Sequence, residues 1–486
     1  MNYALVIAVL ASCVPTQSGG THVAAWIGDT SSFGPAPVAR APGIAEHYAA
    51  TATKIITAAR ADRGAYTKLA HLTDRIGNRI SGSKHLDAAI AWAAQAMKDD
   101  GHEARTEKVM VPHWVRGTED IALMTPIARP LRVLGLGGSV STPKGGITAP
   151  IVVVKTFAEL DAKAAAVKGA IVLYDVALPA YSEDKGSGYG DVVQYRGRGA
   201  SRAAKHGAVA VLVRSVTAHS LRTPHTGAMT YDPEQPRIPA ASVTAEDAML
   251  ISRLAEQGPV TVRMRLESQQ LPDVESANVI GELRGTEKPD EIVVIGAHID
   301  SWDVGQGAHD DGAGCVTMMQ AITVLKQLGL APKRTIRVVL FTNEENGLRG
   351  AKGYAQDHAA ELPKTVFAIE SDAGGFSPRA IGIETKPEVH TRTVARVTEI
   401  AALLRPLGVT KIVSGHSGAD VGPMVPAGVP AAGLYTNGRT YERGNDPLSS
   451  QARSRRTPRE LDRGLCGRKR RSSGGVPAPR EIAPTR

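Results

Sequence analysis

The stretch that decides the fold is Glu291–Ser301, which reads EIVVIGAHIDS. Its first five residues form a short, continuous apolar run, which is typical of a strand that is buried on both faces of a sheet. Thr335–Thr342 (TIRVVLFT) and Thr365–Ile369 (TVFAI) repeat this pattern, and Ala313–Leu328 has apolar residues at helical spacing. Strands that alternate with helices predict an α/β sheet with helices on both faces.

The same pattern continues toward the C-terminus. Helices are expected at Leu348–His358 and Glu388–Leu404, and a last strand at Ala431–Tyr435. Residues 45–100 are mainly helical in pattern, whereas residues 126–272 alternate short β-rich runs with helical segments and contain no cluster of acidic residues. We therefore expect a separate β-rich insert with a binding or covering role.

Composition excludes several classes of protein. The 486 residues are 42% hydrophobic and 22% charged, as in a soluble globular protein of two or three domains. The net charge of +9 is concentrated in residues 451–486, which hold 11 Lys and Arg against 3 Asp and Glu. The rest of the chain is nearly neutral, so no nucleic-acid partner is indicated. Three cysteines make neither a disulfide framework nor a metal motif.

The N-terminus resembles an export signal. Tyr3–Ala11 is the longest apolar run, too short to span a bilayer but of the right length for a signal peptide. Leu10–Cys13 (LASC) resembles a bacterial lipobox, which makes Cys13 a candidate site for a lipid anchor. We expect a secreted or periplasmic protein without a transmembrane span; the alternative is that residues 3–11 form a buried first element.

Polar side chains with metal-binding or acid–base chemistry follow the three apolar strands. They are His298, Asp300, Asp310, Glu344, Glu345 and Asp372. The carboxyl ends of parallel strands meet at one edge of a sheet, so these groups should lie close together. Carboxylates crowded in this way stay ionised near neutral pH only beside a compensating cation. Mixed His and carboxylate ligands suit zinc.

These motifs resemble a known family. The order His-x-Asp-Ser, Asp-Asp-Gly-Ala-Gly, Asn-Glu-Glu and Ser-Asp is similar to that of the di-zinc exopeptidases of metallopeptidase family 28. Ala297–Ala308 (AHIDSWDVGQGA) most resembles the branch of plasma glutamate carboxypeptidase, also called carboxypeptidase Q. The insert resembles the protease-associated domain of that family through Lys168–Val172 (KGAIV) and Ala203–Ala208 (AAKHGA). The resemblance extends over residues 45–440.

The resemblance implies two Zn2+ ions and assigns their ligands. His298 and Asp372 would bind the first zinc, Glu345 would bind the second, and Asp310 would bridge both.

The resemblance also implies the remaining roles. Glu344 would be the general base that takes a proton from the bridging water, and Asp300 would accept a hydrogen bond that fixes the tautomer of His298. The Asp310–Asp311 peptide would be cis.

The family pattern divides the chain into segments, whose expected bounds are as follows: 1–25, signal peptide or lipoprotein signal; 26–44, linker; 45–125, first part of the peptidase domain; 126–272, protease-associated insert; 273–445, zinc peptidase catalytic domain; 446–486, basic disordered tail.

The sequence departs from the family after the last strand. The family has a fifth ligand there, a histidine, whereas residues 442–450 (ERGNDPLSS) contain none and no histidine follows His416. We therefore expect an incomplete second zinc site and impaired activity, unless His416 substitutes. One hypothesis is that the tail is a shifted reading frame, since a one-base slip at residues 445–449 can encode Thr-Thr-His-Tyr-Pro. A natural basic tail is the alternative.

The resulting functional prediction is a zinc exopeptidase that hydrolyses dipeptides or short peptides with free termini, with aminopeptidase or dipeptidase activity. A homodimer is the family expectation. Two alternatives stay open. One is another amide hydrolase or acyltransferase on the same metal site, such as a glutaminyl cyclase. The other is a non-catalytic receptor or binding protein on a peptidase scaffold.

Overall fold

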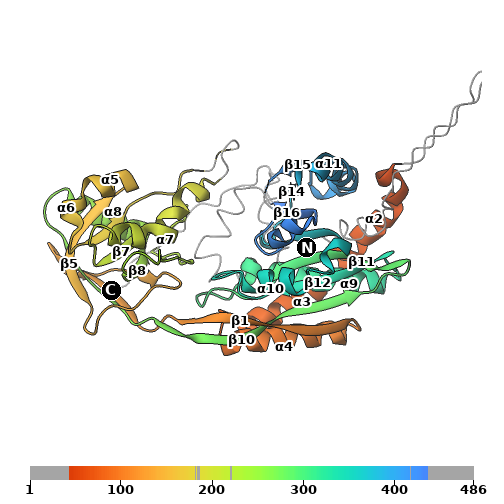
Figure 1. Cartoon of the computed structure of the whole chain (residues 1–486), viewed down its shortest axis with the longest axis horizontal. Coiled ribbons are helices and arrows are strands. Elements are labelled where there is room, and N and C mark those ends of the chain that lie inside the picture. Colours follow the sequence, from red (N-terminus) through yellow and green to blue (C-terminus); the bar gives the residue numbers. More distant parts are fainter. Residues whose placement is uncertain (1–42, 181, 183–186, 219–221, 416, 436–486) are drawn as a thin grey trace, which may run out of the picture. The chain divides into compact units, whose positions relative to one another are not determined.

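The computed structural model describes residues 43–435 except 181, 183–186, 219–221 and 416 (Figure 1). The expected signal segment, nearly all of the expected linker and the expected tail lie outside these residues. Over the described part, no helix is long and apolar enough to cross a membrane.

A mixed sheet forms the framework of the peptidase part. Its order is β1-β10-β12-β11-β13-β16-β14-β15. The central strands β12, β11, β13 and β16 are parallel, and antiparallel strands flank them. The bounds are β1 (Glu103–Val115), β10 (Gln269–Leu283), β11 (Lys288–His298), β12 (Arg334–Phe341), β13 (Thr365–Glu370), β14 (Ala380–Glu384), β15 (Lys411–Ser414) and β16 (Ala431–Tyr435).

Helices cover both faces of this sheet, as the sequence predicts. On β11, Val293 and Ile295 point into a core shared with α2, α4, α9 and α11, whereas Ile292 and Val294 point into a second core with α10 and η5. The bounds are α2 (Ile44–Ala61), α3 (Gly64–His71), η1 (Leu72–Ile76), α4 (Lys84–Asp99), η2 (Ala308–Gly312), α9 (Ala313–Gln327), α10 (Arg349–Asp357), η3 (Leu362–Lys364), α11 (Pro387–Ala401), η4 (Ala402–Leu407) and η5 (Gly422–Ala427). The fold-class prediction is therefore confirmed.

The insert has a sheet of its own, in the order β3-β2-β9-β5-β6-β7-β8-β4. Parallel pairing joins β5, β6, β7 and β8, and α5 to α8 accompany this sheet (Figure 1). The bounds are β2 (Glu119–Thr125), β3 (Arg129–Pro130), β4 (Val133–Gly135), β5 (Ile147–Val154), α5 (Phe157–Ala162), α6 (Ala164–Val167), β6 (Ile171–Tyr174), α7 (Tyr189–Ala204), β7 (Ala210–Arg214), β8 (Ala240–Val243), α8 (Ala245–Ala255) and β9 (Thr261–Leu266). This second sheet agrees with the expectation of a β-rich insert, but it begins with Glu119 of β2, before the expected start at residue 126, because β2 pairs with β9 of the insert.

The pairing register brings three strand ends to the same edge. His298, the last residue of β11, pairs with Phe341 of β12, and Gly296 pairs with Glu370, the last residue of β13. The residues that follow each strand therefore emerge side by side. This alignment places the chemistry-bearing loops next to one another.

Helix α9 packs against β11, the strand that ends in His298. Ile322 lies in its centre and is fully buried in the larger core. We expect Ile322→Ala to lower the free energy of unfolding by about 2–5 kcal/mol, because the change removes buried methyl groups and leaves a cavity. Denaturant unfolding would measure the loss.

A matched control is Met110→Ala on β1, where the side chain is exposed. The control should change stability by less than about 0.5 kcal/mol. Equal effects of the two substitutions would show that the core is wrongly assigned.

Candidate metal centre

His298 is the central residue of the site. Its side chain is fully buried, and its Nε2 lies 3.0 Å from Asp310 Oδ1 and 3.3 Å from Asp372 Oδ1. Its Nδ1 lies 3.0 Å from the backbone carbonyl oxygen of Asp300 and 3.8 Å from the Asp300 carboxylate. A carbonyl oxygen only accepts hydrogen bonds, so Nδ1 carries a proton and donates it to Asp300, and Nε2 is the nitrogen that faces the two acids and would be left to bind a metal ion.

Two consecutive aspartates meet this histidine in different ways. The Asp310–Asp311 peptide is cis, as expected from the resemblance. Asp310 is 58% exposed and reaches Nε2, whereas the buried Asp311 accepts hydrogen bonds from the backbone N–H groups of His298 (3.3 Å) and Gly314 (3.0 Å). Asp311 thus holds the loop against β11.

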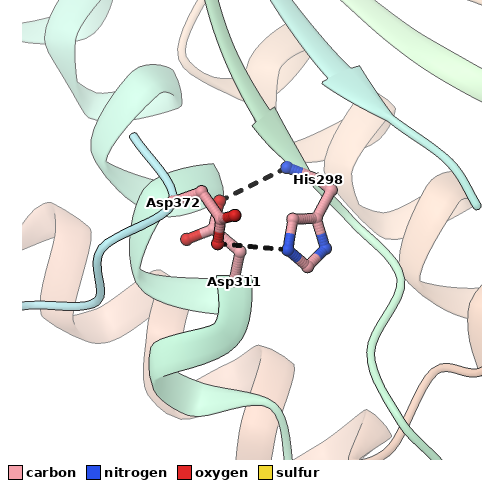
Figure 2. Close-up of side chains that lie close together, drawn as sticks. All are labelled: His298, Asp311 and Asp372. Carbon is pink, nitrogen blue, oxygen red and sulfur yellow. Dashed lines mark hydrogen bonds and ion pairs between the residues drawn. The ribbon is translucent and has the colours of Figure 1, made fainter. Parts of the chain in front are cut away.

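The sequence did not single out Asp311, yet this residue also lies at the cluster. One ligand atom each from His298, Asp311 and Asp372 lie within 4.8 Å of one another (Figure 2). Figure 2 shows the carboxylates of Asp311 and Asp372 on the same side of the imidazole. The donor set around His298 therefore includes three aspartates rather than two.

Asp300 positions the two glutamates. Its carboxylate accepts the backbone N–H of Glu344 at 3.0 Å and that of Glu345 at 3.3 Å. The preceding Asn343 has a left-handed backbone (φ 67°), and its side chain bonds Ser81 at 2.9 Å. These contacts hold the turn after β12 next to the end of β11.

Three acids of the cluster, Asp311, Glu344 and Glu345, lie in surroundings with too little positive charge to keep them ionised. Burial, reinforced by the carboxylates of Asp372 and Asp310, raises the pKa of Glu344 to about 8. Burial likewise raises the pKa values of Glu345 and Asp311 well above the usual range. A bound divalent cation would supply the missing charge, and the His and carboxylate donors are those that zinc accepts.

The excess of negative charge also affects the pKa of His298. Burial by itself lowers the pKa of His298, but the carboxylates of Asp372 and Asp310 outweigh this effect and raise it well above 6.5. The ring therefore holds a proton where a metal ion would otherwise sit.

Arg79 is a structural residue of the site that sequence reasoning missed. Its fully buried guanidinium donates to four backbone carbonyl oxygens at 2.7–3.0 Å, those of Gly77, Ile299, Gln306 and Gly307. These bonds tie the loop that carries Asp310 to the segment between η1 and α4. Only its place in the turn-rich segment 76–83 marks this arginine in the sequence.

A second pair of buried acids lies behind the cluster and was also missed. Glu370 ends β13, and its Oε2 accepts the backbone N–H groups of Asp420 and Val421, both at 2.9 Å. Burial raises the pKa of Glu370 to about 7 and that of Asp420 well above its usual range. In the sequence, these acids are isolated residues that only the fold brings together.

His358 and Cys315 have structural contacts of their own. His358 lies between Glu107 and Glu361, 2.8 Å from each, far from any ligand role. Cys315 is buried, and its thiol donates to the carbonyl oxygen of His298 at 3.0 Å. His416 and residues 442–450 lie outside the described part of the chain.

Comparisons with known proteins find relatives over most of the chain. A model of peptidase family M28 matches residues 278–457, and a PA-domain model matches residues 147–251. Carboxypeptidase Q of Xenopus laevis is 41% identical over 384 residues, which cover 79% of each chain. The crystal structure of a peptidase M28 precursor from Shewanella amazonensis has a TM-score of 0.76 and 36% identity, and covers 81% of this chain and 89% of that one.

A zinc aminopeptidase of Bacillus subtilis shares the fold at lower identity. Its solved structure has a TM-score of 0.57 and is 20% identical, with coverage of 80% of this chain and 93% of that one.

Loss of Arg79 should loosen the site. We expect Arg79→Gln to reduce the free energy of unfolding by at least about 2 kcal/mol, because several buried carbonyl groups lose their donor. Thermal or denaturant unfolding would measure it. The control, Arg75→Gln at an exposed position of η1, should stay within about 0.5 kcal/mol. No difference between the variants would contradict the structural role.

Without metal, stability should fall as the pH rises from about 5 to about 8. Glu344 loses its proton near pH 4.5 when unfolded but near pH 8 when folded, so the folded state holds the extra proton across this range. Each rise in pH then favours unfolding, and the raised pKa of His298 acts in the same direction. Urea unfolding with a chelator would show the slope.

Saturating zinc should flatten that slope, because the cation keeps the carboxylates ionised in the folded state. A metal-free protein that gains stability between pH 5 and 8 would show that the acids are not short of positive charge.

Proposed function

Because this chain belongs to peptidase family M28 and is a metallopeptidase, we propose that it is a zinc exopeptidase that hydrolyses dipeptides or short peptides with free termini. The observation that carries the proposal is the position of His298 Nε2 between Asp310 and Asp372, 3.0 Å and 3.3 Å away. Asp300, which binds the backbone N–H of Glu344, fixes the turn that carries this residue, and burial raises the pKa of Glu344 to about 8.

The donors fit zinc at the first position. His298, Asp310 and Asp372 would hold one ion, with Asp310 shared with a second ion that Glu345 binds. Asp310 suits a bridging role, because its carboxylate is exposed whereas that of Asp311 accepts two backbone N–H bonds. The second position depends on a further donor beyond these four.

Glu344 and Asp300 would have different roles in the reaction. When bound, zinc would lower the pKa of a coordinated water and polarise the scissile carbonyl group. Glu344 would take a proton from that water and pass it to the leaving amine. Asp300 would keep Glu344 in place through its backbone N–H, and the Asp300 carbonyl group would keep His298 in the tautomer that offers Nε2.

The insert supports an exopeptidase in particular. Trp302, in the loop after β11, packs so closely on Gly137 that a side chain there would collide with the indole ring. Arg116 binds both carboxylate oxygens of Asp303 at 2.6 Å. The insert would thus cover the edge that bears His298 and restrict it to chain ends. Export, a lipid anchor at Cys13 and a homodimer stay predictions from the sequence.

The decisive experiment is a dipeptide panel with added zinc, comparing the wild type with Glu344→Gln. The substitution should lower kcat by about 10²–10⁴-fold, because it removes the general base and keeps the shape of the side chain. Zinc content should be unchanged, since Glu344 is not among the four proposed ligands.

The exposed Glu388 on α11 provides the control, and Glu388→Gln should keep full activity. Equal activity of wild type and Glu344→Gln would remove the assigned base. Less than one equivalent of zinc without turnover would favour the non-catalytic receptor instead.

A further inference from the structure

Two buried polar atoms in the insert lack a hydrogen-bond partner among the described residues. They are Nε of Arg196, on α7, and Nδ1 of His225, in the segment between β7 and β8. Burying a hydrogen-bond donor without a partner is unfavourable. Such an arrangement is expected where a ligand completes the bonds.

The two residues belong to one group. Arg196 Nη1 lies 3.4 Å from the carbonyl oxygen of Thr226, the neighbour of His225. The guanidinium carbon of Arg196 lies 5.6 Å from the centre of the Tyr189 ring. Gly227 leaves room for this group, since a side chain there would collide with the guanidinium. The backbone of the insert is thus shaped around Arg196.

This group lies within electrostatic reach of the proposed metal ligands. Asp310 acts electrostatically on both Tyr189 and His225, and Glu345 acts on Tyr189. Burial lowers the pKa of His225 to about 3, so its ring is neutral at physiological pH. Arg196 therefore supplies the positive charge of the group.

Two other arginines near the cluster are already engaged. Arg79 donates to four backbone carbonyl oxygens, and Arg116 is paired with Asp303 and Glu119. Of these three guanidinium groups near the strand ends, Arg196 is the one for which no carboxylate partner is described, and its Nε is unused.

We propose that Arg196, assisted by His225, binds the free α-carboxylate of the substrate, so that the enzyme recognises the carboxyl end of a dipeptide. The fork of a guanidinium group matches a carboxylate with two parallel N–H bonds. A longer peptide would present an uncharged amide at this point. The inference rests on the proposed peptidase function and adds the substrate group that sets specificity.

The test compares a dipeptide with the same dipeptide carrying a C-terminal amide, in the zinc-loaded protein. Wild type should cleave the free acid at least 30-fold more efficiently. Arg196→Gln should raise KM for the free acid at least 10-fold, with a small change in kcat, and change kcat/KM for the amide less than 3-fold. The KM of Arg196→Lys for the free acid should lie between those of the wild type and Arg196→Gln.

A control for folding comes from the same helix. Arg202 is 48% exposed, and its guanidinium carbon lies 5.0 Å from the ring centre of Phe157. Arg202→Gln should behave as wild type on both substrates, and melting temperatures should show that all variants fold. Equal losses on both substrates in Arg196→Gln, or equal cleavage of both by wild type, would overturn the inference.

A binding measurement separates this inference from the proposed function. Calorimetry of the uncleaved dipeptide and its amide with zinc-loaded Glu344→Gln reads carboxylate recognition without turnover. If wild type cleaves neither compound, the proposed function fails, yet tighter binding of the free acid that is lost in Glu344→Gln/Arg196→Gln still supports the inference. Equal binding of both compounds would refute it.

Discussion

The structure depends on one electrostatic constraint, the gathering of acids around a buried imidazole where parallel strands end. Register forces β11, β12 and β13 to finish together, so the loops after them deliver their carboxylates to one place. A bound cation relieves the resulting repulsion and lets the acids stay ionised, whereas without it some of them hold a proton. The surrounding structure holds this unfavourable arrangement in place. Arg79 fixes the loop that bears Asp310. Asp300 fixes the turn that bears Glu344 and Glu345.

The predictable part of the fold is the part buried on both faces. The runs at β11, β12 and β13 have nearly continuous apolar sequences, and the helices between them follow the expected spacing. Strand β1 was not expected, because most of its residues are partly or fully exposed and it lies at the sheet edge. Its existence depends on pairing with β10, and such long-range pairing leaves no local pattern in a sequence.

The residues of the site also fall into those that the sequence predicts and those that it does not. The motifs after the strands identified His298, Asp310 and Asp372, which the fold brings together. Arg79 and the Glu370–Asp420 pair were missed, because each acquires its role only through contacts with distant segments. Arg196 belongs to this second class as well, since its surroundings come from two separate stretches of the insert, helix α7 and residues 225–227.

The pairing of β1 with β10 has a consequence for biosynthesis. Glu103 of β1 pairs with Glu282 of β10, and the whole insert lies between these strands in the sequence. A nascent chain that leaves the ribosome therefore exposes an unpaired β1 until the insert has been translated. The insert can fold first, because its sheet uses only residues 119–266. A folded insert would bring the two strands together and lower the entropic cost of joining them.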